Sequence, residues 1–304
     1  MTTTIFIDGE AGTTGLQIRE RLAGRTDLTL LEIDPALRKD LDERRRLIDA
    51  ADVAILCLPD AAAAESASLA GDATRLIDAS SAHRTAKGWT YGLPELCTGQ
   101  GEAIRRARRV ANPGCWPQGA IAALRPLVDA GLIPPTLAVG VHGISGYSGG
   151  GKSMIADHER AGDDAIGYAP YALGLEHKHM PELQRYSGLS ARPLFTPAVG
   201  HFAQGMIVMT TLQLAALADA PTVARIHAAL ADHHGSIANG AIEVAPLGDA
   251  GTLDPRAHNG TNRMTLHVSG NDAAGQAVVA AVYDNLGKGA SGAAVQNLDL
   301  MLEG

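Results

Sequence analysis

Aromatic residues are scarce in this chain, and it has no long apolar run. Only 4% of its 304 residues are aromatic, whereas 46% are hydrophobic and 35 are glycine. Such a composition favours turns and close backbone approaches over aromatic packing, and it is typical of α/β enzymes with many short connections. No segment approaches the roughly 18 apolar residues that a membrane span needs. The length accommodates two domains with buried cores, and we expect no association with a membrane.

Cysteine is equally sparse. Cys57, Cys97 and Cys115 are far apart and form no CxxC pair, which excludes a disulfide framework and favours a reducing compartment. The first residues run into an apolar segment without a charged leader. We therefore expect a soluble, cytoplasmic protein.

Positive charge is not in excess either. The formal net charge is −8, which argues against a nucleic acid as the main partner, because phosphate backbones are bound by clustered cations. The basic run Arg44-Arg45-Arg46 lies among helix formers, and we interpret it as a solvated helix face. A small anionic substrate stays compatible with this charge, since a few well-placed cations suffice for it.

The first third of the chain alternates between apolar segments and segments with helical spacing. Near-continuous apolar strands separated by helices predict a parallel sheet that is covered on both faces. The strands are expected at residues 5–8, 28–33, 53–58 and 75–78, and the helices at 16–22, 41–50 and 61–70.

Farther along, several apolar segments alternate with polar residues, which suits a second sheet with one exposed face. Strands are expected at 137–141, 207–214, 242–244 and 264–268, and helices at 222–233, 275–283 and 295–302. We predict two domains with a boundary close to Cys115.

A glycine-rich turn, Gly9-Glu10-Ala11-Gly12-Thr13-Thr14-Gly15, follows the first strand and opens a helix. Glycines at such a turn let backbone N–H groups approach a pyrophosphate at the helix N-terminus. Asp34 ends the second strand, where a carboxylate would bond the ribose of NAD, but Arg38 and Lys39 follow and would suit a 2′-phosphate. The residues alone leave NAD and NADP open.

A second motif, Asn112-Pro113-Gly114-Cys115-Trp116, leads into helical spacing over 120–128. It places Cys115 at a helix N-terminus, where the partial positive charge favours the thiolate and lowers the pKa of a cysteine. Backbone N–H groups there would also stabilise an oxyanion. Cys115 is therefore the candidate nucleophile, whereas we expect Cys57 and Cys97 to be structural.

Gly146-Tyr147-Ser148-Gly149-Gly150-Gly151-Lys152-Ser153 matches the P-loop pattern GxxxxGK[ST]. Read literally, it predicts a phosphotransferase or NTPase with Lys152 on the phosphates. No apolar strand ending in Asp follows at a plausible spacing, so we favour a loop that holds a substrate phosphate.

The segment His177-Lys178-His179-Met180-Pro181-Glu182 carries a His–x–His pair, but no third ligand cluster accompanies it. We predict no metal site. A histidine here would instead exchange protons beside a cysteine nucleophile, with Pro181 and Glu182 fixing the loop and the imidazole.

Together these motifs resemble the N-acetyl-gamma-glutamyl-phosphate reductase family in its shorter variety. The resemblance spans almost the whole chain and includes Ile77 to Ser81 with Arg84, Tyr91 to Leu96, Phe202 to Met206, and Asp284 to Asn297. The longer members have Phe-Arg where this chain has His83-Arg84, and Tyr is usual at Trp116.

The resemblance implies a Rossmann-type domain plus an α+β catalytic domain with a mixed sheet, as in aspartate-semialdehyde dehydrogenases. Residues 1–114 and about 282–304 would bind NADP, and residues 115–281 would carry catalysis and homo-oligomerisation as a dimer or tetramer. It implies NADPH-dependent reduction of an acyl phosphate through a thioester, in arginine biosynthesis. Aspartate- or aminoadipate-type semialdehyde dehydrogenases are the alternatives.

The resemblance places the nucleophile on Cys115 and the acid/base on His179, with His177 as the other candidate. The substrate-binding residues would be Arg84, Asn112, Ser145, Ser148, Lys152, Tyr171, His177 and Glu182. The cofactor-binding residues would be Gly9, Gly12, Thr13, Thr14, Gly15, Asp34, Arg38, Pro59, Gln118 and Asn285.

Overall fold

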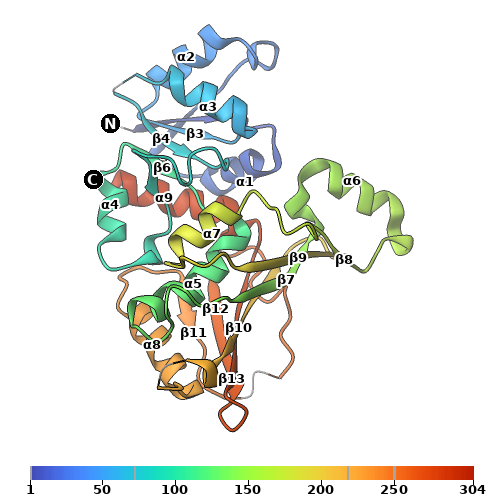
Figure 1. Cartoon of the computed structure of the whole chain (residues 1–304). Coiled ribbons are helices and arrows are strands. Elements are labelled where there is room, and N and C mark those ends of the chain that lie inside the picture. The colour runs from blue at the N-terminus through green and yellow to red at the C-terminus, as the bar shows by residue number, and fades with distance from the viewer. Residues whose placement is uncertain (1, 72, 218, 249–250) are drawn as a thin grey trace. The chain divides into compact units, whose positions relative to one another are not determined.

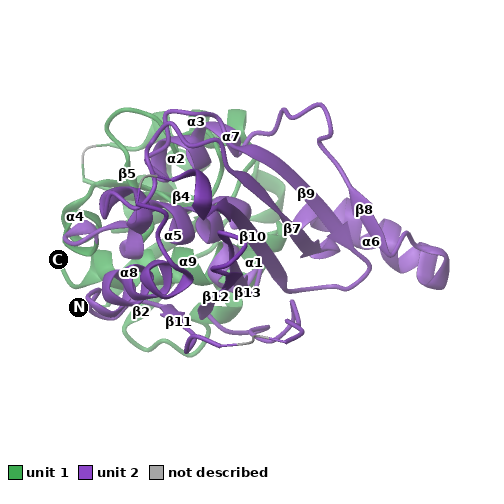
Figure 2. Ribbon diagram, turned by 60° about the horizontal axis from the view of Figure 1, so that its bottom comes forward, with its two compact units in different colours: residues 1–93, 101–114, 290–304 green, residues 94–100, 115–289 purple. Residues whose placement is uncertain are grey.

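The computed structural model describes residues 2–71, 73–217, 219–248 and 251–304, and it forms two compact units (Figures 1 and 2). Unit 1 consists of Met1–Leu93, Gly101–Gly114 and Ala290–Gly304, and unit 2 of Pro94–Gln100 and Cys115–Gly289. Both units are thus assembled from segments that are discontinuous in the chain.

Unit 1 is built on a six-stranded parallel sheet, sheet A, in the order β2-β1-β3-β4-β6-β5. Its strands are β1 (Thr3–Asp8), β2 (Leu28–Leu31), β3 (Val53–Leu56), β4 (Arg75–Asp78), β5 (Thr90–Tyr91) and β6 (Arg109–Ala111). Its helices are α1 (Thr13–Leu22), η1 (Pro35–Leu37), α2 (Leu41–Ala50), α3 (Asp60–Leu69), α4 (Gln100–Arg106) and α9 (Gly292–Leu302). All four residues of β3 are buried, as expected of a strand covered on both faces.

The strand order of sheet A reverses beside β1. The chain first adds β2 on one side of β1 and then crosses to add β3 on the other. In open parallel sheets, ligands bind outside the carboxyl ends of the strands at such a switch point. The glycine turn after β1 and the segment after β3 lie at this position.

Arg44 corrects one interpretation of the sequence. It is only 5% exposed and bonds the buried carboxylate of Asp8, at 3.0 Å from Nη2 to Oδ2, and this carboxylate also accepts a bond from Ser66. Arg45 and Arg46 are exposed, as expected of a solvated face. Arg44 shares its helix face with Leu47 and Ile48, so the helical period turns it inward to the end of β1.

Unit 2 is built on a seven-stranded mixed sheet, sheet B, in the order β11-β12-β13-β10-β7-β9-β8. Its strands are β7 (Gly140–Gly146), β8 (Tyr168–Pro170), β9 (Leu194–Gly200), β10 (Met206–Gln213), β11 (Ile242–Val244), β12 (Met264–Asn271) and β13 (Gln276–Tyr283). Its longer helices are α5 (Cys115–Asp129), α6 (Gly151–Ala161), α7 (Met180–Tyr186) and α8 (Val223–Gly235). Short 3₁₀ segments occur at Pro94–Leu96, Tyr147–Gly150, Gly162–Asp164 and Leu214–Ala216, and a π-helical turn at Gly287–Ser291.

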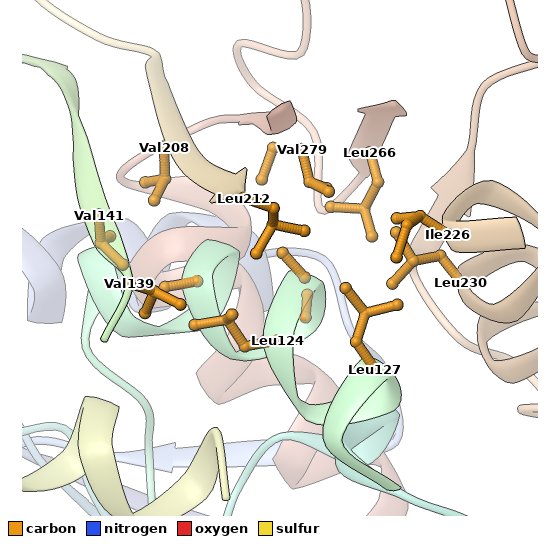
Figure 3. Close-up of a cluster of buried hydrophobic side chains, with 14 of the residues drawn as sticks. Leu124, Leu127, Val139, Val141, Val208, Leu212, Ile226, Leu230, Leu266 and Val279 are labelled. Atoms are coloured by element: carbon orange, nitrogen blue, oxygen red, sulfur yellow. The ribbon is translucent and has the colours of Figure 1, made fainter. Parts of the chain in front are cut away.

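The main core of unit 2 lies between one face of sheet B and helices α5 and α8 (Figure 3). Leu124 and Leu127 of α5 meet Val208 and Leu212 of β10 in this core, and Leu230 of α8 joins them. Alternate residues of β10 enter the core because the side-chain period of a strand is two. The core therefore anchors α5 along its length. Cys115, the first residue of α5, is only partly buried at the edge of this core.

The helix expected over residues 275–283 is wrong, because residues 276–283 form a strand. The segment forms β13, paired antiparallel with β10 and β12 in the interior of sheet B. Periodicity alone does not separate a short apolar run in a helix from one in a buried strand. Its three valines and a tyrosine prefer the pleated sheet, and pairing on both edges supplies every backbone partner. The strand expected at 137–141 is present with different bounds, since it begins at Gly140 and continues to Gly146.

A buried ion pair joins two distant segments of unit 2. Lys288 Nζ donates to both carboxylate oxygens of Glu95, at 2.9 and 3.0 Å, and both residues are at most 2% exposed. Glu95 also accepts from the N–H of Ala241 at 2.8 Å. These contacts compensate two charges that have no access to water.

Among the described residues, no helix has both the length and the hydropathy of a membrane span.

We expect Lys288→Met to lower the free energy of unfolding by about 3–5 kcal/mol, because it leaves the Glu95 carboxylate buried without its cation. Urea denaturation followed by circular dichroism measures this change. The double variant Lys288→Met with Glu95→Leu should recover much of the loss, since both charges are then removed. A single variant as stable as the wild type would contradict the expectation.

Candidate active site

Cys115 is the first residue of α5 in unit 2, as the sequence predicted. The N–H groups of a first helical turn have no partner within the helix and carry its partial positive charge. Gly289 lies against this cysteine, since a Cβ added there would be 3.1 Å from Cys115 Cβ. The nucleophile candidate is thus half-buried and held from the side by backbone.

An aromatic and histidine cluster lies beside the start of α5. The His177 ring lies 4.8 Å from that of His179, 5.7 Å from that of Tyr171 and 5.2 Å from that of Phe195, and Phe195 in turn packs edge-on against Trp116. Burial and the negative charge of Cys115 both raise the pKa of Tyr171. The structure therefore brings predicted residues of the 171–179 segment together near the cysteine.

His179 and Glu182 form a buried pair at the start of α7. His179 is the residue before the helix, and Pro181 occupies its first turn, where a missing N–H costs nothing. Glu182 Oε2 lies 3.5 Å from His179 Nδ1, and the two residues are 2% and 5% exposed. A carboxylate on Nδ1 favours the proton there and turns Nε2 toward other partners.

His177 is held in its neutral form. The backbone N–H of His179 donates to His177 Nδ1 at 3.2 Å, which requires an unprotonated Nδ1. Burial lowers the pKa of His177 to about 4, and the positive charges of His179 and Lys178 act in the same direction. A neutral His177 is a hydrogen-bond donor through Nε2, whereas His179 has the Glu182 carboxylate as its partner.

The glycine-rich segment after β7 gathers three of the predicted residues. Asn285 Nδ2 donates to Ser148 Oγ at 3.0 Å, and Asn285 Oδ1 accepts from the N–H of Gly205 at 2.7 Å. A Cβ on Gly149 would be 3.3 Å from Ser145 Oγ, so the loop passes directly over this serine. Lys152 is exposed on the first turn of α6, beyond this cluster. Asn285 therefore holds the loop, in addition to any cofactor contact.

In unit 1 the glycine turn forms a cradle that side chains would fill. Gly9 has φ +90°, and a Cβ there would lie 2.4 Å from the carbonyl oxygen of Cys57. A Cβ on Gly15 would lie 2.6 Å from the Gly9 oxygen, and Gly12 caps α1 without a side-chain bond. Thr13 and Thr14 form the first turn of α1. This geometry leaves the helix N-terminus open to an anion.

The acidic and basic residues after β2 have partners of their own. Asp34 accepts from the N–H of Ala36 at 2.9 Å and so caps the 3₁₀ turn. Arg38 extends from the end of that turn and bonds Glu10 of the glycine turn at 3.2 Å. The Arg38 guanidinium thus lies beside the glycine turn.

Arg84 and Asn112 are buried at the carboxyl edge of sheet A. Arg84 Nε donates to the carbonyl of Asn112 at 3.0 Å, and Arg84 Nη2 to that of Ala79 at 3.2 Å. The Asn112 amide donates to the Ala290 carbonyl at 3.1 Å and accepts from Asn297. In these bonds both residues hold backbone segments.

Two further predicted cofactor residues belong to different units. Pro59 is exposed and caps α3 after β3, next to the glycine turn at the switch point. Gln118 is fully buried in α5 of unit 2, and its Nε2 donates to the carbonyl of Lys288 at 2.8 Å. In this arrangement the Gln118 side chain points into the protein.

A pair made of a buried carboxylate and a partly exposed histidine escaped the sequence analysis. Asp78 Oδ2 lies 2.6 Å from His83 Nδ1, and the His83 ring stacks on Trp89 with 4.1 Å between centroids. The signal was an aspartate that ends a buried strand five residues before a histidine.

Cys57, which the sequence analysis expects to be structural, follows β3, and burial raises the pKa of its thiol.

Comparison with known proteins identifies the family. Residues 115–285 match the family model described as semialdehyde dehydrogenase, dimerisation domain. Over its full length the chain is 58% identical to N-acetyl-gamma-glutamyl-phosphate reductase of Chelativorans sp., covering 99% of that protein. It is 57% identical to the protein of the same name from Mesorhizobium japonicum, with 98% of each chain covered.

This chain belongs to the N-acetyl-gamma-glutamyl-phosphate reductase family. The resemblance inferred from its motifs is confirmed, and so is the fold class. Aspartate semialdehyde dehydrogenase II of Vibrio cholerae, solved in complex with ASA, superposes with a TM-score of 0.75 at 18% identity, covering 100% of this chain and 99% of that one. The Candida albicans enzyme with NADP gives 0.68 at 15%, with 99% of both chains covered. At such identities these neighbours establish the shared two-domain fold.

We expect His177 in the native protein to titrate with a midpoint near pH 4, well below the usual 6.5, because protonation would place a charge in a buried site. Glu182→Gln should lower the midpoint further, since the Glu182 carboxylate raises this pKa, and Lys178→Ala should raise it. NMR titration of the imidazole protons measures all three. A midpoint near 6.5 in the folded wild type would contradict a buried neutral His177.

Proposed function

We propose that this chain reduces N-acetyl-gamma-glutamyl phosphate to N-acetylglutamate semialdehyde, with NADPH as reductant and phosphate as the second product. The proposal is carried by Cys115 at the start of α5 in a chain 58% identical, end to end, to a reductase of that name. The relatives' name also disfavours the P-loop phosphotransferase alternative for the segment at Gly146–Ser153.

The reaction begins at Cys115. The thiolate, favoured by the helix N-terminus, attacks the acyl carbon; the bond from that carbon to the phosphate oxygen breaks, and phosphate leaves with a proton from solvent. The product of this step is a thioester on Sγ. N–H groups of the first turn of α5 are suited to hold the oxyanion that forms during the attack.

Bound NADPH supplies the hydride that reduces the thioester carbon. His179 gives a proton to the resulting oxygen and takes it back as the C=O bond forms and Sγ departs as thiolate. Glu182 stabilises the protonated imidazole from 3.5 Å. The neutral, low-pKa His177 is less suited to this transfer, so we assign acid/base catalysis to His179 and hydrogen bonding to His177.

The turn of Gly9, Gly12 and Gly15 fits a dinucleotide, because a Cβ on Gly9 or Gly15 would collide with backbone atoms at the turn, and such a tight glycine turn lets backbone N–H groups approach a pyrophosphate. We assign Arg38 to the 2′-phosphate that distinguishes NADP from NAD, because its guanidinium bonds Glu10 of the glycine turn while the Asp34 carboxylate caps the 3₁₀ turn. We therefore assign nucleotide binding to unit 1, and catalysis to unit 2.

For the substrate phosphate we favour Lys152 over Arg84. Lys152 is exposed and follows a glycine-rich loop, which suits an anion. Arg84 is 7% exposed and donates to two backbone carbonyls.

We further propose a homo-oligomer built through unit 2. Ile166 and Tyr168 are 68% and 58% exposed at the β8 edge of sheet B, and Leu194, the first residue of the neighbouring β9, is 54% exposed. All three lie within the region that matches the dimerisation-domain model. Exposed apolar residues gathered at a sheet edge are costly in water and typical of an interface.

The reverse assay tests the proposed substrate. With NADP, phosphate and N-acetylglutamate semialdehyde, NADPH should form faster than with aspartate or aminoadipate semialdehyde. A higher kcat/KM for aspartate semialdehyde or aminoadipate semialdehyde would overturn the proposed substrate but leave the proposed reaction class in place. No NADPH with any of the three would overturn both.

Cys115→Ser should reduce turnover by far more than a hundredfold, because a serine hydroxyl does not form the reactive thiolate. NADPH binding, followed by fluorescence titration, should stay unchanged. A variant that keeps more than about a hundredth of the wild-type rate would contradict the thioester route.

Gly9→Ala should weaken NADPH binding about tenfold or more, since the new Cβ would collide with the Cys57 carbonyl and strain the turn. Gly24→Ala is the matched control, because Gly24 also has a positive φ (+85°) but its added Cβ meets nothing within 4 Å. Equal affinities of the two variants would argue against pyrophosphate binding at this turn.

A further inference from the structure

Tyr283 reaches from the middle of sheet B to the start of α5. It is the last residue of β13, opposite Met206 on one neighbouring strand and Met264 on the other. It is 0% exposed, so its hydroxyl must find partners inside the protein.

The partners of this hydroxyl are both backbone groups of α5. Tyr283 O–H donates to the carbonyl oxygen of Cys115 at 2.5 Å, and the N–H of Gly119 donates to the tyrosine oxygen at 3.2 Å. Cys115 and Gly119 are four residues apart, so these are the two groups that close the first turn of an α-helix. One side chain thus bonds both ends of the turn that begins with the nucleophile.

Gly119 makes room for this contact. A Cβ at position 119 would lie 2.9 Å from both the Cε1 and the hydroxyl oxygen of Tyr283, and 3.0 Å from the Ala281 Cβ. In a helix interior glycine is about 1 kcal/mol less favourable than alanine. The close approach of Tyr283 explains why the helix carries a glycine at this point.

The phenol stays protonated in this position. Burial raises the pKa of Tyr283 well above its usual value of 10, and the negative charge of Cys115 adds to the effect. The hydroxyl is therefore a permanent donor to the Cys115 carbonyl.

We propose that Tyr283 is a positioning residue for the nucleophile: its hydroxyl fixes the first turn of α5 and so aims the Cys115 thiolate at the acyl carbon. First helical turns fray, and a misplacement of about 1 Å costs on the order of a hundredfold in rate. A bond from a central strand holds Cys115 against such fraying. This inference rests on the proposed function only where turnover is measured.

Two variants disturb the contact in opposite ways. Tyr283→Phe keeps the ring and removes the hydroxyl, whereas Gly119→Ala keeps the hydroxyl and pushes it away from the turn. We expect both to lower kcat about tenfold, as for the loss of one buried hydrogen bond, with KM changed less than twofold.

A second readout needs no substrate. The rate of Cys115 alkylation by iodoacetamide, located by peptide mass spectrometry, should fall in both variants at neutral pH. The midpoint of its pH profile should rise, because a loosened first turn stabilises the thiolate less.

The controls separate positioning from stability. Tyr91→Phe removes the hydroxyl of another buried tyrosine, and Gly101→Ala adds a Cβ to a helical glycine of α4 that meets nothing within 4 Å. Both should keep the wild-type kcat and alkylation profile. NADPH binding should be intact in all four variants, as a check on folding.

A wild-type alkylation profile in Tyr283→Phe would overturn the proposal, and so would the same loss of kcat in the two controls. If the wild type fails to reduce the proposed substrate while the alkylation profile still depends on Tyr283, the proposed function fails and the positioning role stands.

Discussion

The backbone of Cys115 is the point on which the candidate active site of unit 2 depends. Helix α5 is held along its length by the core between sheet B and α8, and its first turn is held by the hydroxyl of Tyr283. The backbone of Gly289 packs against the side chain of Cys115. The buried ion pair between Lys288 and Glu95 stabilises the turn that contains Gly289. A nucleophile at the end of a helix keeps its open N–H groups, but it needs this external support.

The histidine cluster shows how one short segment supplies two different imidazoles. His179 has a buried carboxylate beside Nδ1, which favours a proton, whereas His177 accepts a backbone N–H on Nδ1 and has its pKa lowered by burial. Residues two apart in the chain thus have different partners at Nδ1, a carboxylate oxygen for His179 and a backbone N–H for His177. In the proposed reaction this difference assigns proton transfer to one residue and hydrogen bonding to the other.

Much of sheet A and of the candidate site was predictable because the signals are local. The glycine turn, the strands around it and the helix start at Cys115 follow from short patterns of apolar, glycine and proline residues. The prediction failed where local patterns are ambiguous: the valine-rich segment 276–283 is a strand because two neighbours pair with it. Arg44 is buried because Asp8 receives it, a partner 36 residues away.

The sequence by itself determined the family and the reaction class and singled out Cys115 as the candidate nucleophile, since motifs in a fixed order carry that information without coordinates. Only the tertiary structure decided which side chains support that nucleophile. Tyr283 meets Cys115 across 168 residues, and Asn285 meets Ser148 across 137. Such pairs are brought together by sheet pairing and helix packing, which depend on the whole buried core and leave no local pattern in the chain.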